Sequence, residues 1–150
     1  MMDIFPTVAK LCGGTPSSNP VDGIDVWPML SGAKPEIQRE ALLYFDDVHL
    51  QCARLGRFKL HISRYTTTQY NPPPVGGRKN LPLKHAELYD LVADPDESYD
   101  VAPAHPEIAA DIRARIERLI QGFPEPIRAD YEQTKMVATG DAAIGALPHQ

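Results

Sequence analysis

Two basic side chains, Lys59 and His61, lie two positions apart in a segment where apolar and polar residues alternate. Residues two apart in a β-strand point to the same face of the sheet, so both side chains could meet one anionic group. Arg54 and Arg57 lie close to them across an expected hairpin. A phosphate or a sulfate would suit such donors, and we take Lys59 and His61 as the candidate substrate-binding residues. The alternative, a solvated strand face with a partly buried histidine, stays open.

Asp46, Asp47 and His49 form a second group, in which carboxylate and imidazole ligands could hold a divalent metal. The spacing of these residues matches no closed metal-binding loop. Acidic residues that follow a strand usually belong to a solvated turn, and that interpretation is favoured here. We therefore assign no metal ligands in this chain.

A nucleophile with its catalytic partners is not visible in the sequence. The chain has no Gly-x-Ser-x-Gly motif and no glycine-rich phosphate loop. Its 2 cysteines, Cys12 and Cys52, lack the paired spacing of a zinc site, and neither has a convincing base nearby. Both are expected to be buried thiols that pack as small apolar residues. We assign no catalytic residues.

Length, composition and charge narrow the class of protein. A chain of 150 residues allows one domain, or one domain and a tail, and 43% hydrophobic residues permit a modest core. The net charge of -5 argues against nucleic acid as the main partner, because phosphate binding needs a basic face. No apolar run is long enough to span a membrane and no leader pattern opens the chain, so we expect a soluble chain without a membrane partner. The cellular compartment stays unknown.

The elements that would position Lys59 and His61 are short strands. Apolar runs and alternating patterns predict about four of them, joined into an antiparallel sheet with one wet face. An amphipathic helix follows over residues 106–121. The expected fold class is therefore α+β, a small antiparallel sheet of about four strands packed by one C-terminal amphipathic helix. The strands are expected over residues 41–45, 51–55, 58–63 and 87–91.

Three further segments are expected around this sheet. Residues 3–11 predict a short helix with a broad apolar face, which requires a partner surface. Residues 64–85 show no periodicity and are expected to form a long loop. After Gly122, two prolines and a polar, Ala- and Gly-rich end predict a tail. The apolar face of the first helix carries Ile4, Phe5, Val8, Leu11 and Cys12.

The most distinctive stretch is Glu87-Leu88-Tyr89-Asp90-Leu91, followed by Asp94-Pro95-Asp96-Glu97. Three other stretches precede it, at residues 2–11, 22–32 and 54–61. In this order the four stretches resemble the C-terminal part of the sulfatase family, of the arylsulfatase type, within the alkaline-phosphatase-like superfamily. The match covers most of residues 2–102 and is carried by the set rather than by any single stretch.

The resemblance implies a small C-terminal α+β domain over residues 33–122, preceded by the end of the large sulfatase domain at 1–32 and followed by a tail at 123–150. The helix at 3–11 would belong with a missing α/β domain. The family hydrolyses sulfate esters with a formylglycine made from Cys or Ser in a Cys/Ser-x-Pro-x-Arg motif, aided by calcium. Neither cysteine of this chain lies in that motif. Formylglycine and calcium are therefore expected in the missing domain, and no cofactor in this chain.

The function implied is that of a C-terminal sulfatase fragment that packs on the catalytic domain and helps to line its substrate pocket, with Lys59 and His61 as candidates. The chain is expected to be inactive alone. Its partners would be the missing N-terminal domain, the sulfate-ester substrate of the whole enzyme, and a second copy bound through the first helix. Two alternatives stay open: a stand-alone protein that binds anionic or sulfated ligands, and the closing domain of a phosphate or phosphonate ester hydrolase.

Overall fold

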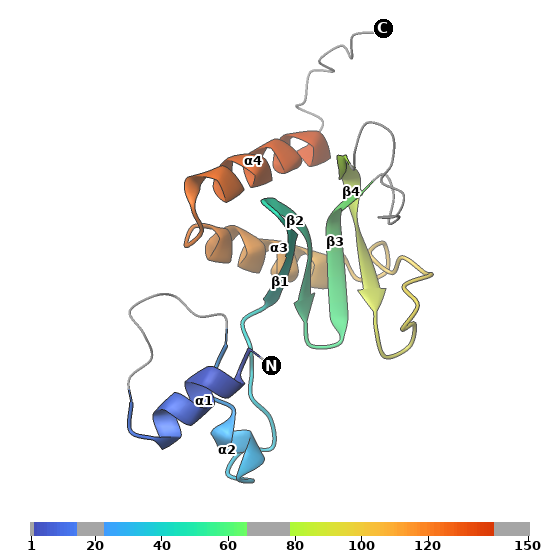
Figure 1. The fold of residues 1–150 in the computed structure, drawn as a ribbon. Helices are drawn as coiled ribbons and strands as arrows, with labels where there is room; N and C mark the ends of the chain where they lie inside the picture. The colour runs from blue at the N-terminus through green and yellow to red at the C-terminus, as the bar shows by residue number, and fades with distance from the viewer. Residues whose placement is uncertain (1, 15–22, 66–78, 140–150) are drawn as a thin grey trace, which may run out of the picture. The chain divides into compact units, whose positions relative to one another are not determined.

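The computed structural model describes residues 2–14, 23–65 and 79–139, and the chain divides into two units, Met1–Gln38 and Arg39–Gln150 (Figure 1). Both candidate residues, Lys59 and His61, belong to the second unit. None of the helices in the described ranges is long and apolar enough to cross a lipid bilayer.

The first unit holds two short helices, α1 at Ile4–Leu11 and α2 at Trp27–Leu30. The predicted helix near the start of the chain is thus confirmed. Asp3 precedes α1 but does not cap it with its side chain, because its Oδ1 accepts a hydrogen bond from the backbone N of Ile24 at 2.8 Å. This bond fastens the start of α1 to the segment that leads into α2.

The second unit is built on a 4-stranded antiparallel sheet in which each strand pairs with the next in the sequence. The predicted α+β class is confirmed. A tight hairpin at Gly56 joins the two central strands, and its φ of 57° is one that glycine adopts without strain. The strands are β1 (Leu42–Asp46), β2 (His49–Leu55), β3 (Phe58–Tyr65) and β4 (Asn80–Asp90).

β4 is longer than the sequence pattern predicted. Residues 80–85 were expected to belong to a loop, because no periodicity was found over residues 64–85. Pro82 lies opposite Ser63, and it is tolerated because β4 is at the edge of the sheet, where no further strand needs its missing N–H. The strand predicted over 87–91 is the last part of β4. Residues 66–78 of the predicted loop lie outside the described residues.

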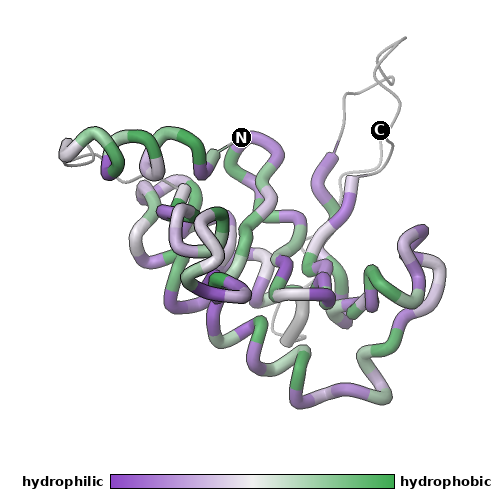
Figure 2. Tube along the Cα trace, turned by 90° about the horizontal axis from the view of Figure 1, so that it is seen from below, coloured by the Kyte–Doolittle hydropathy of each residue, from purple (hydrophilic) through white to green (hydrophobic). Residues whose placement is uncertain are grey.

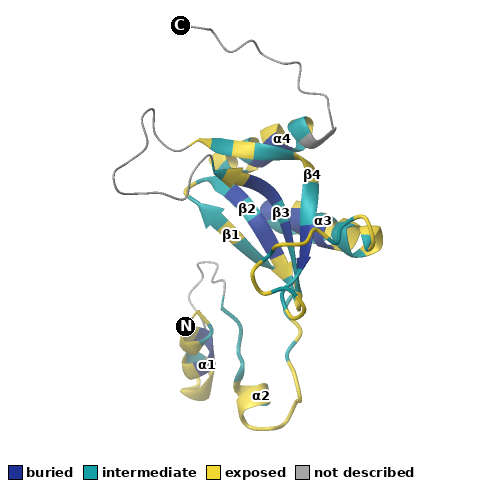
Figure 3. Ribbon diagram, turned by 90° about the vertical axis from the view of Figure 1, so that its right-hand side faces the viewer, coloured by how far each residue is buried: buried dark blue, intermediate teal, exposed yellow. Residues whose placement is uncertain are grey.

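The core of the second unit lies between the sheet and α3, the helix at Pro106–Ile120, as the burial colouring of Figure 3 shows. The helix predicted there is confirmed, and its core stripe includes Ile112, Ile116 and Ile120, all at 0% exposure. Full burial of such side chains contributes roughly 1.5–3 kcal/mol each. The sheet residues in this core include Leu50, Ala53, Leu60 and Leu88.

A second helix, α4 at Glu125–Thr139, corrects the prediction of a tail. The sequence pattern indicated irregular chain here because of Pro124 and Pro126. Pro126 lies in the first turn of α4, where a missing N–H breaks no helical hydrogen bond. Tyr131, 3% exposed, joins the core, and α4 packs against β4 and β2. The described sheet is thus packed by two helices rather than one, while the domain boundaries at 32 and 122 stay predictions.

Candidate functional site

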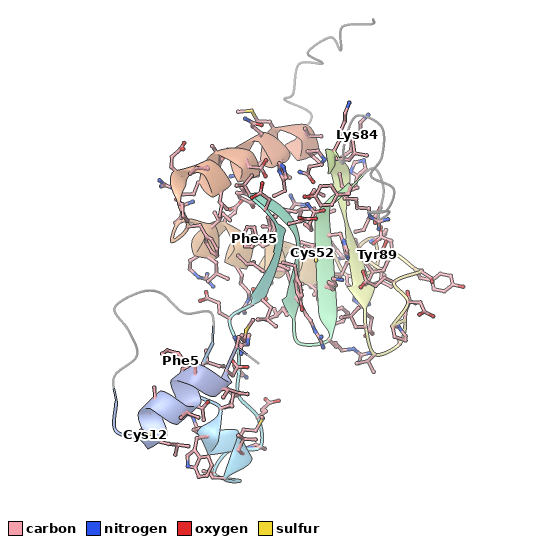
Figure 4. All side chains as sticks on the ribbon, viewed as in Figure 1. Phe5, Cys12, Phe45, Cys52, Lys84 and Tyr89 are labelled. Carbon is pink, nitrogen blue, oxygen red and sulfur yellow. The ribbon has the colours of Figure 1, made fainter. Side chains whose placement is uncertain are left out.

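Lys59 and His61 lie on the face of the sheet opposite α3, which we call the outer face. Antiparallel partners point to the same side of a sheet, so the strand register identifies their neighbours. Figure 4 labels two of these neighbours, Cys52 in the middle of the sheet and Tyr89 on β4. The residues of the described sheet on the outer face include Leu42, Tyr44, Cys52, Arg54, Lys59, His61, Arg64, Glu87 and Tyr89.

Glu97 bridges the two candidate side chains. Lys59 Nζ donates a hydrogen bond to Glu97 Oε1 at 2.7 Å, and His61 Nε2 lies 2.6 Å from Glu97 Oε2. A carboxylate only accepts hydrogen bonds, so Nε2 of His61 carries the hydrogen. The side chains of Lys59, His61 and Glu97 are 20%, 17% and 26% exposed. The structure thus brings the two predicted residues together and adds an acidic partner; we call these three residues the ionic cluster.

The turn after β4 presents Glu97 to the other two residues. Glu97 has a φ of 53°, a left-handed conformation that costs a non-glycine residue about 1 kcal/mol or more. Asp94 supports this conformation, because its Oδ2 accepts a hydrogen bond from the backbone N of Ser98 at 2.7 Å. Asp100 fastens the turn to the sheet through a hydrogen bond of 2.9 Å from the backbone N of Leu88. The position of the Glu97 carboxylate is therefore fixed by the backbone around it.

Burial and neighbouring charges set the protonation states of the cluster. Burial lowers the pKa of His61, the hydrogen bond to Glu97 opposes that shift, and the Lys59 ammonium adds to it, so that the net direction is downward. Burial raises the pKa of Glu97, but the hydrogen bonds from Lys59 and His61 outweigh it and the net pKa is lowered. At neutral pH the ionic cluster thus holds an ammonium, a carboxylate and a neutral imidazole.

A second network on the outer face joins Glu87, Arg64 and Tyr89. Glu87 Oε2 pairs with the Arg64 guanidinium and accepts a hydrogen bond from the Tyr89 hydroxyl at 2.8 Å. Arg64 Nη2 also donates to that hydroxyl, at 2.8 Å. Burial raises the pKa of Tyr89, as does its hydrogen bond to Glu87. The Arg64 guanidinium, like the Lys59 ammonium, is thus paired with a carboxylate.

Two aromatic rings flank the ionic cluster. The ring of Tyr89 meets that of His61 edge to face, with centroids 5.6 Å apart. The Tyr44 ring centroid lies 5.7 Å from Lys59 Nζ, and Tyr44 is 40% exposed. Both contacts are of a kind that favours a fixed orientation of the polar group.

Arg54 and Arg57 were expected near Lys59 and His61 across the hairpin. Their guanidinium groups form hydrogen bonds with other residues. Arg54 Nε donates to the backbone oxygen of Gly56 at 2.9 Å. Arg57 Nε donates to Asp90 Oδ1 at 2.6 Å. The structure therefore does not bring these two guanidinium groups into the ionic cluster.

The group Asp46, Asp47 and His49 is only partly brought together, since Asp46 and His49 are partners across β1 and β2. Asp47 is exposed and has a φ of 56° in the turn between β1 and β2. His49 Nδ1 lies 2.7 Å from Asp130 Oδ1 on α4. In the ranges that the structure describes, no group of three or more His, Cys, Asp or Glu side chains is arranged to hold a metal ion.

Neither cysteine of this chain is suited to become formylglycine. Cys52 is 3% exposed, and burial raises the pKa of its thiol to about 11. Cys12, which was expected to be buried, is exposed, and Gly-Gly-Thr-Pro follows it rather than the required motif. The described carboxylates nearest the candidate residues are occupied by Lys59, His61 and Arg64.

Glu97 is the residue of this site that the sequence pattern did not single out. It lies 36 residues after His61, and its contact depends on a positive φ that few non-glycine residues adopt. The available signal was an acidic turn directly after β4. Since β4 and β3 are neighbours in the sheet, a carboxylate in that turn lies close to the cations of β3.

Comparisons with known proteins agree with one another. The family described as the C-terminal region of aryl-sulfatase matches residues 37–143. Similar proteins include arylsulfatase D of Homo sapiens, 32% identical over 134 residues, and steryl-sulfatase of Mus musculus, 29% identical over 142 residues. Arylsulfatase A of Bos taurus is 24% identical over 155 residues. The alignments cover 77%, 79% and 98% of this chain, respectively, but only 22%, 22% and 30% of those proteins.

A solved structure also matches, from work on the metabolism of multiple glycosaminoglycans by Bacteroides thetaiotaomicron. Its TM-score is 0.55 at 24% identity, and the match covers 78% of this chain and 24% of that one. At this identity the likeness shows a shared fold alone.

The fold and the site together define a small α+β domain whose outer face carries a neutralised ionic cluster and, among its described residues, no activated nucleophile. The chain belongs to the sulfatase family, of which it is a C-terminal region. It spans about a quarter of the length of the curated relatives that it matches.

Proposed function

We propose that this chain serves as the C-terminal region of a sulfatase, packs on a catalytic domain supplied by the rest of that enzyme, and has no sulfate-ester hydrolase activity alone. The observation that carries the proposal is the match over residues 37–143 in a chain that spans only 22–30% of three sulfatase relatives. Formylglycine and calcium would then be held by the catalytic domain.

The outer face would form part of the substrate-pocket wall, with Lys59 and His61 as its contributing residues. Three features support this role. The ionic cluster lies on the face opposite α3, it is partly exposed, and its geometry is held by Asp94 through a strained turn. A polar cluster fixed in this way is typical of a surface that must present one arrangement of donors and acceptors.

The size of the native polypeptide tests the proposal. An antibody raised against this chain, used on an immunoblot of the cells that make the protein, should reveal a band well above 16.6 kDa, the mass of this chain. A band at 16.6 kDa would overturn the proposal. The stand-alone protein that binds anionic or sulfated ligands would then be the better account.

The purified 150-residue chain should not turn over an aryl sulfate in the presence of calcium. The physical reason is that Cys52 is a buried thiol with a pKa near 11, and Cys12 lies outside the formylglycine motif. A colorimetric assay with 4-nitrocatechol sulfate measures this directly. Calcium-dependent turnover that disappears in His61→Ala would contradict the expectation.

A further inference from the structure

Two cations of the outer face, at and beside the ionic cluster, are each paired with a carboxylate. Lys59 is paired with Glu97, and Arg64 is paired with Glu87. His61 adds no charge at neutral pH, because burial and the nearby ammonium favour its neutral form. The positive potential around the ionic cluster is therefore lower than its basic residues suggest.

An incoming anion would have to compete with Glu97. Its carboxylate already accepts hydrogen bonds from Lys59 Nζ at 2.7 Å and from His61 Nε2 at 2.6 Å. A sulfate oxygen that replaced it would leave a partly buried carboxylate without its partners, and one that joined it would meet like-charge repulsion. The turn around Glu97 also resists movement of this carboxylate, since Asp94 holds its backbone.

The groups beside the cluster suit an uncharged ligand. Tyr44 offers an exposed ring next to Lys59, and the His61 ring packs against Tyr89. Because Nε2 of His61 donates to Glu97, the second ring nitrogen, Nδ1, is an acceptor and not a donor. Such a surface fits hydroxyl and aromatic groups better than it fits sulfate.

We propose that Glu97 is a positioning residue that occupies the donors of Lys59 and His61 and so prevents them from binding the sulfate group. This wall of the pocket then faces the uncharged alcohol part of the ester. The inference rests on the proposed function, since it assigns a part of the substrate to the wall described there. By this inference the acidic turn that carries Glu97 contributes to the substrate specificity of the enzyme.

Binding of inorganic sulfate to the 150-residue chain tests the inference. Sodium sulfate is titrated at pH 7.5 and constant ionic strength, and the side-chain NMR signals of Lys59 and His61 are followed. We expect no saturable shift in the wild type and at least tenfold tighter binding in Glu97→Gln, which removes the competing charge. The matched control is Asp96→Asn, which removes an exposed carboxylate from the same turn and should behave as the wild type does. Wild-type binding as tight as that of Glu97→Gln would overturn the inference.

Two measurements on the wild type keep the inference falsifiable if Glu97→Gln fails to fold. Long-range ¹H–¹⁵N correlation should show His61 protonated at Nε2 and not at Nδ1 at pH 7.5; the opposite tautomer or an imidazolium ring would overturn it. Phenol, as a probe of the alcohol part, should shift the signals of Tyr44 and His61 saturably. The absence of any response to phenol would count against the assignment of the alcohol part to this wall.

These outcomes are independent of the size of the native polypeptide. A band at 16.6 kDa together with Glu97-dependent exclusion of sulfate would end the sulfatase proposal and leave the role of Glu97 in excluding anions. A larger band together with tight sulfate binding by the wild type would end this inference alone.

Discussion

The partly buried imidazole of His61 makes the stability of the second unit depend on pH. The pKa of His61 is lowered from 6.5 in the folded chain, so below about that pH the unfolded chain binds a proton that the folded chain does not. The free energy of unfolding therefore falls as the pH drops below 6.5. Glu97 acts in the same direction at lower pH, because its pKa is lowered from 4.5 and its ion pair is lost as the carboxylate is protonated.

We expect His61→Gln to lose the upper part of this dependence, since glutamine can still donate to Glu97 but does not titrate. Urea unfolding between pH 7.5 and pH 5.5 measures the slope, which for one histidine cannot exceed about 1.4 kcal/mol per pH unit. Gln133→Ala, a change at an exposed residue of α4 that does not titrate, serves as the control and should keep the wild-type slope. An unchanged slope in His61→Gln would contradict the lowered pKa.

The position of Lys59 and His61 on the same face of β3 was predictable from sequence, whereas their contact with Glu97 was not. Alternation in β3 places the two side chains on one face whatever the rest of the chain does. Glu97 reaches them only because the turn after β4 adopts one particular backbone conformation. Local pattern therefore predicts which side chains share a face of a strand, but not which carboxylate neutralises them.

At the scale of elements, α3 and α4 differ in how far their sequences reveal them. α3 has a stripe of isoleucines that matches the helical period, and it was predicted. α4 offers fewer apolar positions, chiefly Ile127 and Tyr131, beside two prolines. Its helix depends on tertiary packing of Tyr131 rather than on a strong pattern of its own, and that packing is not visible from sequence.

Tyr131→Ala should release α4 from the sheet. Truncation of a buried aromatic side chain costs about 3–5 kcal/mol, and Tyr131 is 3% exposed. Burial also raises the pKa of Tyr131 to about 12. Urea unfolding should show this loss, and amide hydrogen exchange should show faster exchange across α4.

Gln133→Ala is the matched control for this experiment, because Gln133 is an exposed residue of the same helix. A change there is expected to stay within about 0.5 kcal/mol. If Tyr131→Ala were no more disruptive than Gln133→Ala, the docking of α4 would not depend on the buried ring.

At the scale of the whole molecule, the main feature is the apolar face of α1. The hydropathy colouring of Figure 2 marks α1, next to the N-terminal label, as mostly hydrophobic. Ile4, Phe5, Val8 and Leu11 are between 49% and 58% exposed. Contiguous apolar surface of this kind usually meets a partner, and the catalytic domain of our proposal is one candidate for that partner.

The isolated chain should therefore dimerise or leave α1 poorly ordered. Light scattering should give a mass that rises with concentration, or hydrogen exchange should be fast in α1. Phe5→Ser combined with Val8→Ser should restore the monomer mass, whereas Lys10→Gln on the polar side of α1 should not. A monomeric wild type with α1 protected from exchange would contradict this expectation.

The sequential strand order has a consequence for the kinetics of folding. β1, β2 and β3 are joined by short turns, so their pairing closes only small loops and can form early. α4 packs against β2 and β4, so we expect it to dock only after these strands have paired. Tyr131→Ala should thus accelerate unfolding and leave the refolding rate nearly unchanged, so that stopped-flow chevron plots shift mainly in their unfolding limb. α4, the helix that the sequence pattern did not predict, would then determine the unfolding rate and so the lifetime of the folded state.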